Sequence, residues 1–100
     1  MWLKFNDGSS PLINLDKAYC LDSGLDKDGH MIIYARYDRA PRPFDWKKDE
    51  FICSFDEGAS IKDECFYQAL ANAVNSGRVI CNVDELVEEA EKIYDAIEIE

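Results

Sequence analysis

Arginine and aromatic side chains occur together between residues 34 and 47 of this chain. Arginine stands at every third position from residue 36 to residue 42, and aromatic residues lie before, between and after these arginines. A guanidinium group forms paired hydrogen bonds to carboxylate or phosphate, and an aromatic face stacks on a base or on a guanidinium group. The pattern therefore predicts a surface that recognises an anion or another protein. The candidate binding residues are Arg36, Arg39, Arg42, Phe44, Trp46 and Lys47.

Most of these residues belong to a predicted connector between two strands, residues 39–50. Pro41 and Pro43 fix their own φ angles and push the preceding residues toward extended geometry, so we expect the connector to be stiff. A connector of this length in a compact domain is more often functional than idle. The alternative is that its arginines neutralise the acidic helices of the same chain, while Phe44 and Trp46 pack on the core.

The chain is acidic, with a formal net charge of −10, but the charge is unevenly distributed. Residues 31–48 contain five basic and two acidic side chains, whereas the rest of the chain contains six basic and nineteen acidic ones. Most of the surface should therefore repel nucleic acid, and direct binding to DNA or RNA is not expected. The asymmetry would allow the basic connector of one copy to contact an acidic helix of another, so a homodimer is one alternative.

Side chains suited to catalysis or metal binding are sparse. The single histidine, His30, ends a polar loop, and we interpret it as a solvated residue because no nucleophile motif accompanies it. Asp22, Asp26 and Asp28 faintly resemble a calcium loop, but the first acidic ligand and the closing glutamate are absent. Local hydrogen bonds to the backbone are the preferred interpretation of these aspartates. We predict a protein that is not an enzyme and that uses no metal and no cofactor.

The four cysteines could form two disulfides, but their surroundings favour another interpretation. Cys20, Cys53 and Cys81 lie within apolar runs and Cys65 lies in a helical pattern, so all four are predicted to be small buried residues. No apolar run approaches the length of a membrane span, and the first residues lack the pattern of a signal peptide. These features predict a cytoplasmic protein without membrane contact.

The elements that must position the connector follow from the spacing of apolar residues. Residues 31–37 have the strongest strand pattern, with Tyr34 and Arg36 on one face of the strand and Tyr37 on the other. Further strands are predicted at residues 2–5, 11–15, 18–21 and 51–55.

Two helices are predicted in the second half of the chain. The first covers residues 61–76, with Ser60 as its N-cap and Gly77 as its stop. It has a wide apolar face that contains alanines, which would let a neighbouring element approach closely. The second is capped by Asp84 and has a narrow apolar stripe. Its predicted outward face contains Glu88, Glu91, Lys92 and Asp95.

A run of strands followed by helices predicts an α+β fold, with one antiparallel sheet of about four to five strands and two C-terminal helices packed on one face. The length of 100 residues predicts a single globular domain over residues 1–100, strand-rich over residues 1–55 and helical over residues 60–97.

The leading functional hypothesis is a non-catalytic module that regulates another protein by binding to it. This hypothesis depends on three features of the sequence: the lack of a recognisable catalytic motif, the wide apolar face of the first helix, and the opposite charges of the connector and the second helix. A first alternative is a binder of a small anionic ligand or nucleotide, held by connector residues 36–48. A second alternative is an acidic mimic of nucleic acid that inhibits a DNA- or RNA-binding protein through Glu88, Glu91 and Asp95.

Overall fold

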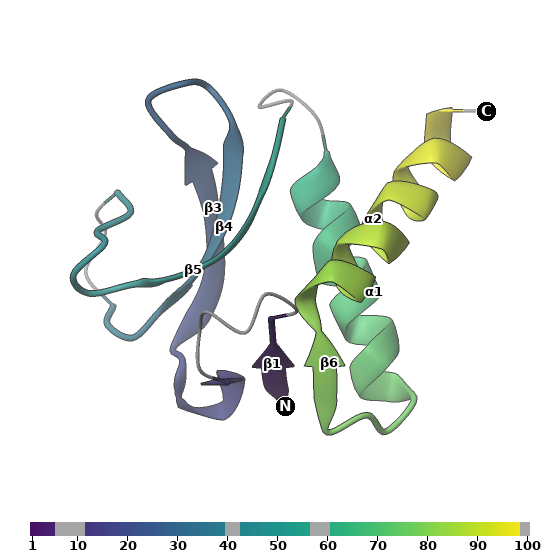
Figure 1. Cartoon of the computed structure of the whole chain (residues 1–100), viewed down its shortest axis with the longest axis horizontal. Helices are drawn as coiled ribbons and strands as arrows, with labels where there is room; N and C mark the ends of the chain where they lie inside the picture. Colours follow the sequence, from purple (N-terminus) through teal and green to yellow (C-terminus); the bar gives the residue numbers. More distant parts are fainter. Residues whose placement is uncertain (6–11, 40–42, 57–60, 99–100) are drawn as a thin grey trace. The chain divides into compact units, whose positions relative to one another are not determined.

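The computed structural model of the protein describes residues 1–5, 12–39, 43–56 and 61–98. Within these residues the fold is α+β, with two helices and two sheets of three strands each (Figure 1). The chain divides into two compact units, a helical unit (Met1–Leu15 with Ile61–Glu100) and a strand unit (Asp16–Ser60). The α+β class predicted from the sequence is confirmed.

The strand unit contains an antiparallel sheet in the order β3-β4-β5. Its strands are β3 (Cys20–Leu25), β4 (Met31–Arg36) and β5 (Glu50–Phe55), and a short 3-10 helix, η1 (Leu15–Lys17), precedes them. Every residue of β4 is buried, as expected for the central strand of the sheet. The hairpin between β3 and β4 turns at Gly29, whose φ of +81° is a left-handed conformation that glycine adopts without strain.

The pairing between β4 and β5 shifts by one residue in the middle of the strands. Ile33 lies opposite Cys53, but Tyr34 lies opposite Phe51, so β5 carries one extra residue, Ile52, at this point. Opposite residues share a face of the sheet, and successive residues alternate between faces. The extra residue therefore places Phe51 on the same face as Tyr34, as β-bulges commonly do when they re-aim a side chain.

The helical unit contains the second sheet, in which β1 (Trp2–Lys4) lies between β2 (Ile13–Asn14) and β6 (Ile80–Asn82). β1 is antiparallel to β2 and parallel to β6, and Figure 1 shows β1 and β6 side by side. Leu3 and Cys81 are opposite each other in the parallel pair, and both are buried. This mixed sheet joins strands from the two ends of the sequence.

The two helices, α1 (Lys62–Asn75) and α2 (Val83–Glu98), pack against each other (Figure 1). Ala69 and Ala73 of α1 and Ala90 of α2 are buried, in agreement with the predicted alanine-containing face. Small side chains at a helix contact allow a short distance between the helix axes. In the described part of the chain, no helix has the length and apolar character needed to cross a membrane.

The end of α1 agrees with the prediction from Gly77. This residue has a φ of +81°. Its N–H donates to the carbonyl of Val74, and the N–H of Arg78 donates to the carbonyl of Ala73. A residue in the left-handed region that lets following N–H groups satisfy the last carbonyls is a common way for a helix to end.

The start of α2 differs from the prediction. We expected Asp84 to be the N-cap, but the Oδ1 atom of Asn82 accepts a hydrogen bond of 2.9 Å from the N–H of Asp84, and the helix begins at Val83. Asn82 is therefore the capping residue, and Asp84 lies in the first turn, where a negative charge stabilises the helix dipole. Ser60, the predicted cap of α1, lies outside the described residues.

The prediction of one antiparallel sheet with four to five strands is not matched. The described strands form two sheets of three, and the pairing of β1 with β6 is parallel. The reason is that an alternating pattern indicates that a segment is extended but does not indicate which other segment supplies its hydrogen bonds. The single domain expected from chain length stays a prediction.

All four cysteines are free thiols. Cys53, Cys65 and Cys81 are buried and Cys20 is half-buried, which confirms that cysteine serves here mainly as a small buried residue. Burial raises the pKa of the Cys53 thiol from 9.0 to about 12, because the charged thiolate is disfavoured away from water.

Replacing Gly77 by alanine should lower the free energy of unfolding by about 1 kcal/mol, because a residue with a Cβ atom is strained at positive φ. Gly77→Asn is the matched control, since asparagine tolerates this conformation better and should cost less. Urea unfolding followed by circular dichroism measures both variants. Equal losses for alanine and asparagine would contradict the proposed cause.

The free energy of unfolding should fall as the pH rises above about 9, in part because of Cys53. The folded state keeps the thiol proton up to about pH 12, whereas the unfolded chain loses it near pH 9. This contribution is present below pH 9 and is lost as the pH rises toward 12, with a slope of at most about 1.4 kcal/mol per pH unit. Urea unfolding at several pH values should show a smaller decline in Cys53→Ala than in the unmodified protein. Parallel declines would contradict the prediction.

Candidate functional site

A hollow of about 540 Å³ lies on the strand unit. Three segments line it: one face of the sheet, the tip of the β3–β4 hairpin and the predicted connector. We name it the aromatic groove. Its lining residues are Leu25, Asp26, Lys27, Asp28, Ile32, Pro43, Phe44, Trp46, Phe51 and Ser54.

Four aromatic rings form a continuous chain beside this groove. The ring centroids of Tyr34 and Phe44 are 4.8 Å apart, and those of Phe44 and Trp46 are 4.7 Å apart in an edge-to-face arrangement. The ring of Trp46 also stacks on Phe51 at 5.6 Å. Each such pair adds about 0.5–1.5 kcal/mol beyond the burial of its surface. The connector is therefore held to the sheet through Tyr34 on β4 and Phe51 on β5.

Trp46 keeps most of its surface in contact with water in spite of these ring contacts. Its exposed fraction is 73%, and that of Leu25, another lining residue, is 63%. The sequence left open whether Phe44 and Trp46 would be exposed or packed on the core. The structure shows both features in Trp46, whose indole contacts Phe44 and Phe51 and is still largely exposed. A fixed and exposed indole can receive an apolar or aromatic group with little further loss of conformational entropy.

The turn that presents Trp46 is held by two aspartates. The carboxylate of Asp49 is buried and accepts a hydrogen bond of 2.9 Å from the N–H of Asp45. In return, the N–H of Asp49 donates to the carbonyl of Asp45 at 2.8 Å. The Oδ1 atom of Asp45 also accepts a bond from the N–H of Lys47. These bonds close the turn on both sides of Trp46, so the backbone that carries the indole is fixed locally.

Two of the arginines predicted to bind a ligand, Arg36 and Arg39, are not among the described residues that line the aromatic groove. Arg36 is buried, and its Nη1 atom lies 3.3 Å from Oδ2 of Asp22 while its Nη2 atom lies 3.7 Å from Oδ1 of Asp38. The guanidinium carbon of Arg39 lies 5.1 Å from the ring centroid of Tyr19. Arg36 thus interacts with carboxylates of its own chain, although these belong to the strand unit and not to the helices.

Of the other predicted residues, the structure brings Phe44 and Trp46 together in the groove. Lys47 is exposed and follows Trp46, but it does not line the groove. Arg42 lies outside the described residues. Tyr37 is also absent from the lining. Its pKa is raised mainly by burial and to a smaller extent by the nearby Glu50 carboxylate. Binding by the arginines stays a prediction.

The hairpin tip is a part of the groove that the sequence did not indicate. The Oδ1 atom of Asp26 accepts hydrogen bonds from the N–H groups of Asp28 and His30 at 2.9 and 2.8 Å. Its Oδ2 atom lies 3.7 Å from Nδ1 of His30. These contacts confirm the expected local use of aspartate in the loop. No local signal places the hairpin beside the connector, because its position depends on how β3 and β5 flank β4.

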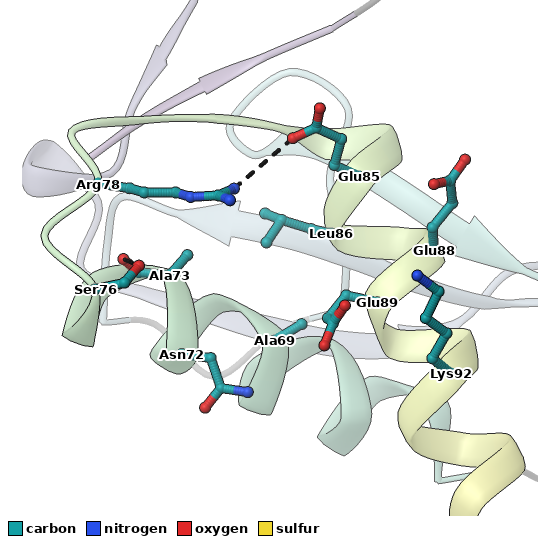
Figure 2. Close-up of a pocket in the computed structure, with 10 residues that line it drawn as sticks. All are labelled: Ala69, Asn72, Ala73, Ser76, Arg78, Glu85, Leu86, Glu88, Glu89 and Lys92. Atoms are coloured by element: carbon teal, nitrogen blue, oxygen red, sulfur yellow. Dashed lines mark hydrogen bonds and ion pairs between the residues drawn. The ribbon is translucent and has the colours of Figure 1, made fainter.

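A second hollow, of about 380 Å³, lies between α1 and α2 (Figure 2). Its apolar lining consists of Ala69, Ala73 and Leu86, and its rim carries charges of both signs. Figure 2 shows Arg78 directed at Glu85, with 3.8 Å between nitrogen and oxygen. Because small residues and internally paired polar groups dominate here, the aromatic groove is the stronger candidate site.

The polar groups of this second hollow are largely used by their neighbours. The Oδ1 atom of Asn72 accepts a hydrogen bond from Nε2 of Gln68, and the hydroxyl of Ser76 donates to the carbonyl of Ala73, each at 2.9 Å. For metals, a search of the described residues finds no group of three or more His, Cys, Asp or Glu side chains that could hold an ion.

Replacing Asp49 by alanine should lower the free energy of unfolding by about 1 kcal/mol, because the partly buried N–H of Asp45 loses its acceptor. Asp49→Asn keeps an acceptor oxygen and should lose less. Time-resolved fluorescence anisotropy of Trp46, measured in a Trp2→Phe background, should show faster local rotation only in the alanine variant. Unchanged rotation in that variant would contradict the role of Asp49 in fixing the turn.

Comparison with known proteins gives no match: no protein-family model, no curated protein sequence and no solved structure is similar to this chain. A proposal about function therefore rests on the side chains described above. Among them, the exposed ring of Trp46 and the groove beside it are the features best suited to contact a ligand.

Proposed function

We propose that the protein is a non-catalytic interaction module that binds a segment of another protein in the aromatic groove. The observation that carries this proposal concerns Trp46, whose ring contacts two other rings and which is still 73% exposed. Large exposed apolar surfaces beside a hollow are typical of binding sites, and tryptophan is enriched among the residues that dominate binding energy. A regulatory role in the cytoplasm is part of the same proposal.

The charges near the groove support a protein segment over a small anion or nucleotide. An anion would meet the carboxylates of Asp26 and Asp28, which belong to the lining. Of the cations that could attract it, Arg36 and Arg39 interact with Asp22, Asp38 and Tyr19 instead. The described lining offers Lys27 against the two carboxylates of Asp26 and Asp28. A peptide can place apolar side chains against Trp46 without placing negative charge beside these carboxylates.

Mimicry of nucleic acid has less support. Its proposed face included Glu91, but Oε2 of Glu91 lies 3.1 Å from Nζ of Lys62, whose ammonium group also lies 5.0 Å from the ring centroid of Tyr94. This pairing between α1 and α2 reduces the free negative charge of the face. Self-association stays an alternative in which the bound segment belongs to a second copy of the chain.

Selection from a displayed library of random peptides tests the proposal. We expect peptides to be enriched on the unmodified protein, and Trp46→Ala should weaken their binding about thirtyfold, because truncation of a central tryptophan commonly costs about 2 kcal/mol. Fluorescence anisotropy of labelled peptides measures the affinities.

Tyr19→Ala is the control for this experiment, since Tyr19 is another exposed ring of the strand unit and does not line the groove. It should leave peptide affinity unchanged, and circular dichroism should confirm that both variants are folded. A selection without enrichment, or peptides that bind Trp46→Ala as tightly as the unmodified protein, would overturn the proposal.

A further inference from the structure

We propose that the segment bound in the aromatic groove is basic, with a lysine or arginine next to a bulky apolar side chain. This inference rests on the proposed function and specifies the partner's chemistry. It follows from the two kinds of surface that the described lining offers, one apolar and one with two aspartates, and from the contacts that hold each of them.

The apolar surface comes from Trp46 and Leu25, which are 73% and 63% exposed. Burying such side chains against an apolar partner group contributes roughly 25 cal/mol per Å² of surface removed from water. The exposed part of the indole also offers π surface to a lysine or arginine, because the negative charge density of an aromatic face attracts a cation. An arginine is especially suited, since its flat guanidinium group stacks on a ring.

The acidic surface comes from the hairpin tip. Asp26 is oriented by the N–H groups of Asp28 and His30, so its carboxylate has a defined position in the lining. Asp28 is exposed, and no hydrogen bond or ion pair of its carboxylate is found within the described part of the chain. A carboxylate in this situation can pair with a partner's ammonium or guanidinium group without first breaking a contact with described residues.

The surrounding cations do not cancel this negative charge. Lys27 is the only basic residue among the lining residues that the structure describes, against two aspartates. Lys47 follows Trp46 but is not part of the lining, and Arg36 and Arg39 interact elsewhere. The described lining of the groove thus contains one more negative than positive charge, and charge complementarity favours a positively charged segment over an acidic one.

The peptides enriched by the library selection test this inference through their composition. We expect lysine or arginine to be over-represented next to a bulky apolar residue. For the most enriched peptide, Asp28→Asn should weaken binding about three- to fivefold at low salt, the size expected for an exposed ion pair. The difference between the two proteins should shrink as the salt concentration rises.

Lys27→Gln is the matched opposite variant, because it removes a positive charge from the same hairpin and should increase the affinity for a basic peptide at low salt. Peptides that depend on Trp46 but are neutral or acidic would overturn this inference and leave the proposed function intact. Equal affinities for the unmodified protein and Asp28→Asn would also overturn it. A selection that enriches nothing would overturn both.

Discussion

The position of Trp46 depends on the contact between the connector and the sheet, and that contact depends on the register of β4 and β5. Because β5 has one extra residue opposite the step from Ile33 to Tyr34, Phe51 lies on the face of the sheet that carries Tyr34. A shift of one residue sends a side chain to the other face. Without the extra residue, Phe51 would face away, and the indole of Trp46 would lose the ring on which it stacks. The hydrogen bonds between Asp45 and Asp49 also hold the turn that contains Trp46. The position of Trp46 therefore depends on two features, the strand register and this turn.

Some charged side chains of the strand unit are paired within the sheet, and others are exposed beside the groove. Arg36 lies on the central strand and faces Asp22 and Asp38, so this cation is used within the sheet. A buried guanidinium group needs such partners, because an unpaired charge away from water is strongly destabilising. The carboxylates of the hairpin tip, by contrast, stand at the edge of the groove. The segment with the most basic sequence thus contributes aromatic rings to a groove whose described lining has two aspartates and one lysine.

Local features of this structure could be predicted from the sequence, and non-local ones could not. The strand at Met31–Arg36, the two helices and the stop at Gly77 follow from periodicity and backbone preference over a few residues. The parallel pairing of β1 with β6 joins segments far apart in the sequence, and no local pattern specifies it. The same limit applies to the site: Phe44 and Trp46 were expected, but the contributions of Phe51 and the hairpin depend on strand register. We predicted Asp84 as the cap of α2, but Asn82 has this role. Both side chains can accept the capping hydrogen bond, and the sequence alone does not decide which of them does.

A comparison of the aromatic groove with the hollow between α1 and α2 shows why an exposed ring is more informative than volume alone. Between α1 and α2, Arg78 and Glu85 form an ion pair within the lining, and the apolar part of the lining is small. In the aromatic groove, Trp46 and Leu25 are largely exposed, and the ring of Trp46 already contacts Phe44 and Phe51. Binding there would remove apolar surface from water while ordering few additional bonds. Exposed apolar surface and existing ring contacts therefore occur at the same place, which is the physical reason why we propose the groove beside the connector as the interaction surface.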